Sequence, residues 1–145
     1  MAPNLYNARQ AVDLVMLMQL IGREAGNQTD DGMRGVAWSV KNRVARPNFW
    51  DWGYDWETVI EKKWAYSSIN GAPNDPNLRK YPNLHVEPWE RCLAIAEEIF
   101  TGTGTDPTAG ATHYFDKSLD ANPPDWAARM VHTLDLGDFH FYKPA

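Results

Sequence analysis

The 145-residue sequence has a single cysteine, Cys92, and lacks a long hydrophobic run. One cysteine excludes an internal disulfide, so the fold does not depend on an oxidising compartment. A membrane-spanning helix needs about 20 consecutive apolar residues, and the run from Leu14 to Ile21 is far shorter. This run follows Asp13 rather than a basic cluster, so we predict neither a membrane span nor a signal peptide.

Basic residues are too few to favour a nucleic-acid partner. The chain has 14 Lys and Arg against 19 Asp and Glu, a net charge of −5, whereas phosphate binding needs clustered positive charge. Arg34, Lys41, Arg43 and Arg46 fall within one helix-like segment, which predicts a solvated helix face rather than a binding stripe. The sequence also lacks a G-x-S-x-G elbow and a phosphate-binding loop.

Large aromatic residues, in contrast, are abundant, with seven Trp and six Tyr. Such side chains fill protein cores, and their flat rings also stack on sugar rings in carbohydrate clefts. Trp50, Trp52, Trp56 and Trp64 are candidates for sugar stacking, with core packing as the alternative.

A capping box predicts the start of the first helix. Asn7 is followed three positions later by Gln10, an arrangement that satisfies two free amide groups at once. Apolar residues then recur at helical spacing, and Gly22 and Gly26 bracket the end of the segment. Glu24 is therefore expected in the last turn.

Two further helices follow from the same periodicity. We predict that Asp30 or Asp31 caps the second and that Pro47 terminates it. The third occupies residues 87–102 and carries Cys92 on its apolar face. A buried structural thiol is expected there, because nothing nearby would lower the pKa of a nucleophile.

The remaining segments predict a minor β element. Residues 66–85 are rich in Asn, Pro and Gly and are typical of a long functional loop. Residues 111–115 have an extended pattern, 126–130 a short helix, and 131–142 the alternation of a small hairpin. The fold class is thus α+β, predominantly α, with residues 1–145 forming a single domain.

Glu24 is the strongest candidate for chemistry. A carboxyl group at a helix C-terminus faces the negative end of the macrodipole, which disfavours its ionised form. Partial burial would act in the same direction. Both effects would raise the pKa of Glu24 and keep it protonated, as a general acid requires. The alternative is a surface ion pair with the adjacent Arg23.

The histidines offer a competing possibility. His113, His132 and His140 could together bind zinc, but they lack the close pairing of two ligands on one helix that marks zinc peptidases. We therefore predict no metal and no cofactor, with hydrogen-bonded or solvent-facing histidines as the simpler interpretation.

Three ordered segments match a known pattern. Residues 21–44 contain a Glu-Ala pair, a spacer, a Gly and an amphipathic helix ending in Asn-Arg-Val. Residues 106–115 (DPTAGATHYF) and 136–142 (LGDFHFY) follow in order. Together they resemble the SleB/CwlJ cell-wall hydrolases, which include spore cortex-lytic enzymes and phage relatives. In the second block, Ala109 stands where the family pattern has the first of two glycines.

This resemblance implies a lysozyme-like fold, peptidoglycan as substrate and glycan cleavage by one essential Glu. Matched position by position, Glu24 corresponds to the catalytic Glu, Asn42 to the helix-end Asn and Tyr114 to a cleft tyrosine. Tyr66 and Ser67 correspond to a Phe-Ser pair near the cleft. Thr112 and His113, in the second block, complete the predicted substrate-binding set.

Glycosidic cleavage ordinarily takes two carboxylates, and no second one falls in a matched motif. Asp51, Asp55, Asp106 and Asp116 are candidates. One carboxylate suffices if the C6 hydroxyl of N-acetylmuramic acid attacks its own C1, because the nucleophile is then already in place. We therefore predict a lytic transglycosylase that leaves 1,6-anhydro ends, with a hydrolytic muramidase as the alternative.

Two rival functions remain open. A non-catalytic peptidoglycan-binding module would keep the aromatic cleft, and a metal-dependent amidase would use the histidines. For the favoured enzyme we expect a monomer, made in the cytoplasm and acting on the cell wall after phage delivery or release through a holin.

Overall fold

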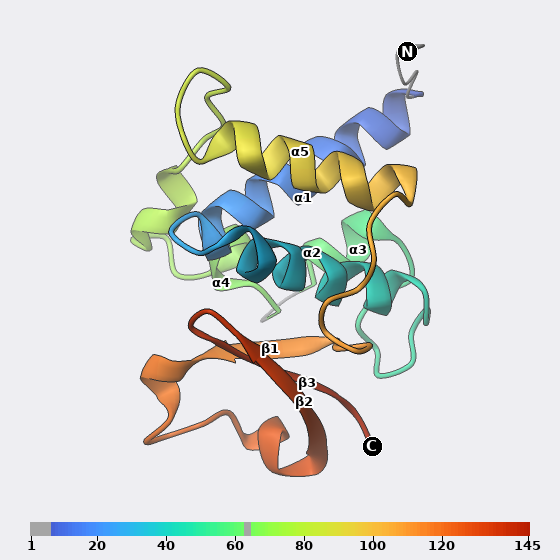
Figure 1. Ribbon diagram of the computed structural model, residues 1–145, viewed down its shortest axis with the longest axis vertical. Helices are drawn as coiled ribbons and strands as arrows, with labels where there is room; N and C mark the ends of the chain where they lie inside the picture. Colours follow the sequence, from blue (N-terminus) through green and yellow to red (C-terminus); the bar gives the residue numbers. More distant parts are fainter. Residues whose placement is uncertain (1–6, 63–64) are drawn as a thin grey trace.

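The computed structural model describes residues 7–62 and 65–145 and is mostly helical (Figure 1). The helices are α1 (Ala8–Ala25), α2 (Asp30–Val44), α3 (Trp56–Ile60), α4 (Ser67–Asn70) and α5 (Trp89–Thr101). Short 3₁₀ helices are η1 (Pro76–Arg79), η2 (Lys117–Leu119) and η3 (Asp125–Arg129), and the strands are β1 (His113–Asp116), β2 (Met130–Leu136) and β3 (Phe139–Pro144). The predicted class, α+β and predominantly α, is confirmed.

The predicted ends of α1 are confirmed. The Gln10 amide donates to Asn7 Oδ1 at 2.8 Å, and the Asn7 amide donates to Gln10 Oε1 at 3.1 Å. Helix α1 runs to Ala25, so Glu24 lies in its last turn. The cap of α2 differs from the prediction, because Thr29 rather than an aspartate caps it, accepting a bond from the Gly32 amide.

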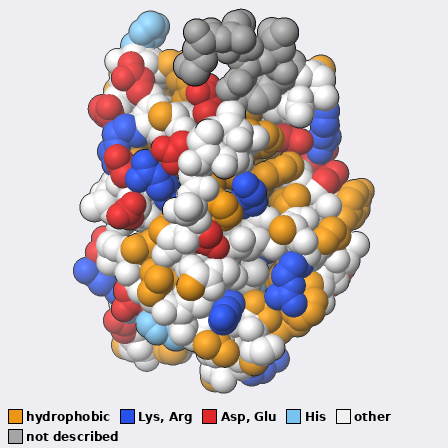
Figure 2. Space-filling view, turned by 45° about the vertical axis from the view of Figure 1, so that its right-hand side comes forward, with side chains coloured by type: hydrophobic (Ala, Val, Ile, Leu, Met, Phe, Trp, Pro, Cys, Tyr) orange, Lys and Arg blue, Asp and Glu red, His pale blue; other side chains and the backbone are white. Residues whose placement is uncertain are grey.

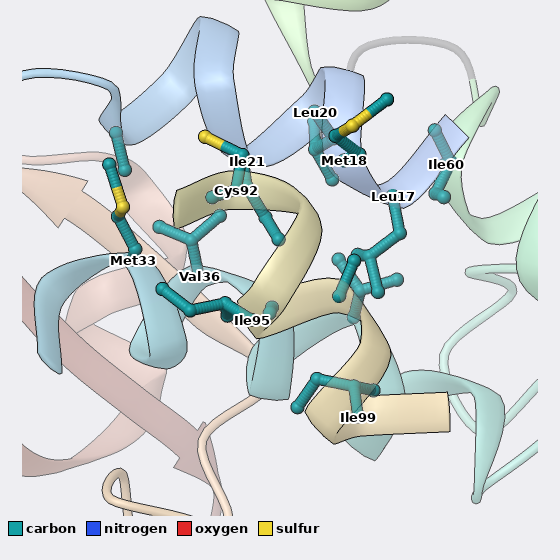
Figure 3. Close-up of a cluster of buried hydrophobic side chains, with 14 of the residues drawn as sticks. Leu17, Met18, Leu20, Ile21, Met33, Val36, Ile60, Cys92, Ile95 and Ile99 are labelled. Carbon is teal, nitrogen blue, oxygen red and sulfur yellow. The ribbon is translucent and has the colours of Figure 1, made fainter. Parts of the chain in front are cut away.

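The hydrophobic core lies where α1, α2 and α5 pack together (Figure 3). Leu17 and Ile21 come from α1, Met33 from α2, and Cys92 and Ile95 from α5. Burial raises the pKa of the Cys92 thiol to about 11, so the thiol stays protonated and serves as a packing group, as predicted.

The three strands form an antiparallel sheet in the order β1-β3-β2, which lies beside the helices (Figure 1). Strands β2 and β3 confirm the predicted hairpin. Phe141 is fully buried and its ring packs over Gly35 of α2, where a side chain would collide with it. This contact holds the inner face of the sheet against α2 and places the edge strand β1 near the end of α1.

The predicted loop over residues 66–85 contains α4 and η1 and is organised by Arg23. The Arg23 side chain is only 8% exposed. Its guanidinium donates to three backbone carbonyls, those of Ser68 (2.9 Å), Lys80 (2.9 Å) and Leu78 (3.1 Å). Arg23 is therefore committed to this segment, and the alternative of a surface ion pair with Glu24 is wrong.

The molecular surface carries mixed charge. On the face drawn in Figure 2, acidic and basic side chains are interspersed with exposed hydrophobic ones. Within residues 7–62 and 65–145, no helix has both the length and the apolar character needed to cross a bilayer.

Candidate active site

Glu24 lies where two surface pockets meet. The first has a volume of about 670 Å³ and runs along β1 towards η3. The second, about 540 Å³, lies between the end of α1, η1 and the start of α5. Both are lined by Glu24 and by Asp116, the last residue of β1. Glu24 is therefore shared by the two pockets, which together form the groove around its carboxyl group.

The surroundings of Glu24 raise the pKa of its carboxyl group. Burial is the main cause of a raised pKa, and the negative charge of Asp75 adds to it. Hydrogen bonding from the hydroxyls of Ser68 and Tyr114 acts in the opposite direction but does not overcome burial. The Ser68 bond, from Oγ to Glu24 Oε1, measures 2.9 Å. The direction of the pKa shift agrees with the sequence argument.

Tyr66 is a buried residue at the first pocket. Its side chain lines the first pocket and is only 3% exposed. Its hydroxyl makes no hydrogen bond within the part of the chain that the structure describes. The hydroxyl is itself buried, with the Ser39 side chain nearby, so Tyr66 belongs to the floor of the pocket and not to its exposed surface. The neighbouring Ser67 was predicted to lie near the cleft, but its side chain lies outside what is described.

His113 also lines the first pocket, and it is uncharged. Burial and the nearby Arg43 guanidinium lower the pKa of His113 to about 3. The Thr112 hydroxyl lies 2.9 Å from His113 Nδ1 and fixes the ring. Because Thr112 is only 1% exposed, it orients His113 and does not itself reach the groove.

Aromatic rings extend the wall of the first pocket. The His113 ring lies 4.9 Å from the ring of Trp126 and 6.0 Å from that of Trp50. Trp50 and Trp126 both line the pocket and are suited to stacking on sugar rings. Trp52 lines the pocket too, but its indole N–H already donates hydrogen bonds to the backbone carbonyls of Arg43 and Arg46.

Trp56, another stacking candidate, does not line this pocket. Trp56 packs on Phe100, with 4.8 Å between the ring centroids. Trp64 lies outside the described residues.

Asn42 is placed for support rather than for contact with a ligand. Its side-chain amide donates to Asp106 Oδ2 at 2.9 Å and to the Ala111 carbonyl at 2.8 Å. Asp106 in turn accepts bonds from the amides of Thr108 and Gly110. Asn42 therefore ties the end of α2 to the loop before β1, and neither pocket that contains Glu24 includes it.

Arg43 departs from the prediction of a solvated basic face. It is 7% exposed, donates from Nε to the Thr112 carbonyl at 2.7 Å, and lines the first pocket. Its guanidinium also lies over the Tyr66 ring, 5.4 Å from the centroid. Helical spacing could not identify this position, because long-range packing against β1 buries it.

Sequence reasoning also missed the roles of Ser68 and Trp126. Ser68 is one residue beyond the predicted Ser67. Asp116 was one of four candidate carboxylates and lines both pockets. Of the others, Asp55 caps α3, and Asp106 accepts a hydrogen bond from the Thr108 amide within its own loop. Asp51 lies at the first pocket, where it pairs with Lys62 at 3.1 Å.

Comparisons with known proteins identify the family and a similar fold. A family model described as Cell Wall Hydrolase matches residues 27–142 and thus begins just after Glu24. The catalytic domain of the germination-specific lytic transglycosylase SleB from Bacillus anthracis has a similar fold, with a TM-score of 0.71 and 22% identity over 98% of this chain and 100% of that one. The catalytic domain of Bacillus cereus SleB gives a TM-score of 0.70 and 22% identity, over 98% and 95%. Among curated proteins, none matches the chain.

Proposed function

We propose that this chain, which belongs to the cell wall hydrolase family, is a lytic transglycosylase that cleaves the glycan strand of peptidoglycan. The observation that carries the proposal is the position of Glu24, with a carboxyl group of raised pKa at the junction of two pockets. The SleB catalytic domain of similar fold is itself described as a lytic transglycosylase, which supports the same chemistry here.

In the proposed reaction, Glu24 acts first as an acid and then as a base. Its proton passes to the glycosidic O4 of N-acetylglucosamine as the bond from O4 to C1 of N-acetylmuramic acid breaks. The C6 hydroxyl of the same muramic acid then attacks C1 and returns a proton to Glu24. The product carries a 1,6-anhydro ring and no water is consumed. The attack is intramolecular, so no second carboxylate is needed to activate a nucleophile.

The neighbouring groups have supporting roles in this proposal. The Ser68 hydroxyl orients the Glu24 carboxyl group, and the Tyr114 hydroxyl hydrogen-bonds to the same carboxyl group. The exposed ring of Trp50 is available to the sugars. The neutral His113 contributes a ring and no charge.

Asp116 favours one alternative, the hydrolytic muramidase. It lines both pockets together with Glu24, the arrangement expected of a second carboxylate that activates water. In a hydrolase, loss of this base would cost activity of the order of 10²–10⁴-fold. In a transglycosylase, Asp116→Asn would retain most activity.

Product analysis separates these alternatives. Purified sacculi are digested in ¹⁸O-labelled water by the wild type, Glu24→Gln and Asp116→Asn, and the muropeptides are analysed by mass spectrometry. We expect anhydro ends without labelled oxygen from the wild type and from Asp116→Asn, and none from Glu24→Gln. Labelled reducing ends that disappear in Asp116→Asn would replace the proposal with hydrolysis.

Controls address the two remaining rivals. The exposed Glu90→Gln on α5 should cleave like the wild type. A peptidoglycan-binding module would release no muropeptide in any variant, and an amidase would release stem peptides instead of glycan fragments. We further propose that residues 1–145 act on the wall as one monomeric domain, which light scattering of the pure protein tests.

A further inference from the structure

A second cluster of polar side chains lies on the sheet and takes no part in the groove. His132 Nε2 and His140 Nδ1 lie 2.6 and 2.8 Å from the same atom, Asp135 Oδ1. The three residues offer ligand atoms that all lie within 4.8 Å of one another. Neither pocket lined by Glu24 includes any of them.

A β-bulge creates this cluster. His132 and Asp135 are three residues apart on β2, so in a regular strand they would point to opposite faces. The register shifts between His132 and Leu134, so that His132 pairs with Tyr142 while Asp135 pairs with His140. His140 and Tyr142 are two residues apart and share one face of β3. The extra residue therefore turns His132 onto the face of Asp135 and His140.

This face of the sheet is the outer one. Phe139 and Phe141 alternate with His140 on β3 and are buried towards the helices. His140 consequently points away from the core. A pocket of about 610 Å³ adjoins it, lined by Asp120, His132, Asp135 and His140 among others.

Asp120 completes an arrangement that recurs around bound metals. Its Oδ1 lies 2.7 Å from His140 Nε2. A histidine that ligates a metal through one ring nitrogen almost always donates its other N–H to a carboxylate or carbonyl. Asp120 is therefore placed to accept the Nε2 proton when Nδ1, which lies 2.8 Å from Asp135 Oδ1, ligates a metal.

We propose that His132, Asp135 and His140 bind one Zn²⁺ ion on the outer face of the sheet, with Asp120 as the carboxylate that orients His140. Two imidazoles and one carboxylate suit zinc, whose usual coordination is tetrahedral. The adjoining pocket leaves room for water as the fourth ligand. Ca²⁺ and Mg²⁺ prefer oxygen ligands and are expected to bind poorly.

The site is structural rather than catalytic. A bound ion would link β2 to β3 at the bulge and, through Asp120, hold the residues that follow η2. Zinc binding should therefore raise the melting temperature and leave glycan cleavage unchanged.

Titration of the tag-free, metal-stripped protein with ZnCl₂ tests the proposal by calorimetry. We expect one ion bound per chain and a rise of several degrees in melting temperature at saturation. His132→Ala and His140→Ala should each abolish this binding. Asp120→Ala should weaken it by about 10–100-fold. The exposed His85→Ala is the matched control and should bind zinc like the wild type.

Circular dichroism of the zinc-free variants shows whether they fold. CoCl₂ gives an independent readout, because tetrahedral Co²⁺ absorbs strongly in visible light and needs no enzymatic activity. Zinc binding that is equal in the wild type and in the folded His132→Ala and His140→Ala variants would overturn the proposal. So would an absence of binding by the wild type, which would leave the cluster as a surface ion-pair network only.

Discussion

The Ser68 hydroxyl donates a 2.9 Å hydrogen bond to Oε1 of Glu24, across 44 positions of sequence. Ser68 is held there from its other side, because its carbonyl accepts a bond from the Arg23 guanidinium. Two adjacent residues of α1 are thus coupled through one residue of α4. Arg23 positions the segment, and that segment orients the acid.

Removing the Ser68 hydroxyl should change the pH dependence of cleavage. The bond lowers the pKa of Glu24, so Ser68→Ala should raise that pKa further. The alkaline limb of the kcat/KM profile should move to higher pH, with a maximal rate reduced about fivefold for a bond worth about 1 kcal/mol. Muropeptide release measured over a range of pH checks this. An unshifted limb in Ser68→Ala, with the exposed Thr105→Ala as control, would contradict the orienting role.

Replacing the acid should stabilise the protein. The pKa of Glu24 is raised in the folded state, so between the unfolded and folded pKa values the folded chain holds a proton that the unfolded chain releases. Stability is therefore lost as the pH rises through this interval. Glu24→Gln has no titrating group at this position, so its stability does not fall over this pH interval.

Its melting temperature should exceed that of the wild type at pH 7 and converge on it as the pH falls towards about 4.5, the ordinary value for Glu. Thermal unfolding of both proteins across this range tests the expectation. Glu90→Gln, at an exposed position, should show no such pH-dependent difference.

Arg23→Lys should destabilise the fold. An ammonium group cannot replace the three donors that reach separate carbonyls, and bonds from charged groups are worth about 1.5–3 kcal/mol each. We expect a loss of about 2–3 kcal/mol in urea unfolding. Cleavage should fall as well, because Ser68 lies in the released segment. Arg129→Lys, at an exposed position, should cost less than about 0.5 kcal/mol.

Ala109→Gly should stabilise the loop before β1. Ala109 has a φ of 56°, in the left-handed region that favours glycine. That conformation costs an L-residue about 1–2 kcal/mol. Glycine removes this cost, but it also increases the conformational entropy of the unfolded chain, which offsets part of the gain. We expect a gain of about 0.5–1 kcal/mol in thermal unfolding. The neighbouring Gly110, with a φ of 89°, should respond in the opposite direction when changed to Ala.

Local rules identified the helices and the position of Glu24 correctly. The capping box of α1 and the apolar face of α5 each depend on residues within a few positions of one another. The cap of α2 was misplaced by one residue, because Thr29 and two aspartates compete for that role and only the backbone geometry decides between them. Arg43 was misread for a different reason, since helical spacing carries no information about a strand that packs on the helix from 69 positions away.

The sequence by itself determined that an acidic residue would close the first helix, because capping and helical periodicity are properties of neighbouring residues. It also carried the three blocks that relate the chain to its family. Only the tertiary structure decided what surrounds that acid: the Ser68 hydroxyl, the unsatisfied Tyr66 and the carboxylate of Asp116. These groups are brought to Glu24 by packing between segments that are distant in the sequence, and local sequence patterns do not predict such contacts. The same packing buries Glu24 and so raises the pKa of its carboxyl group.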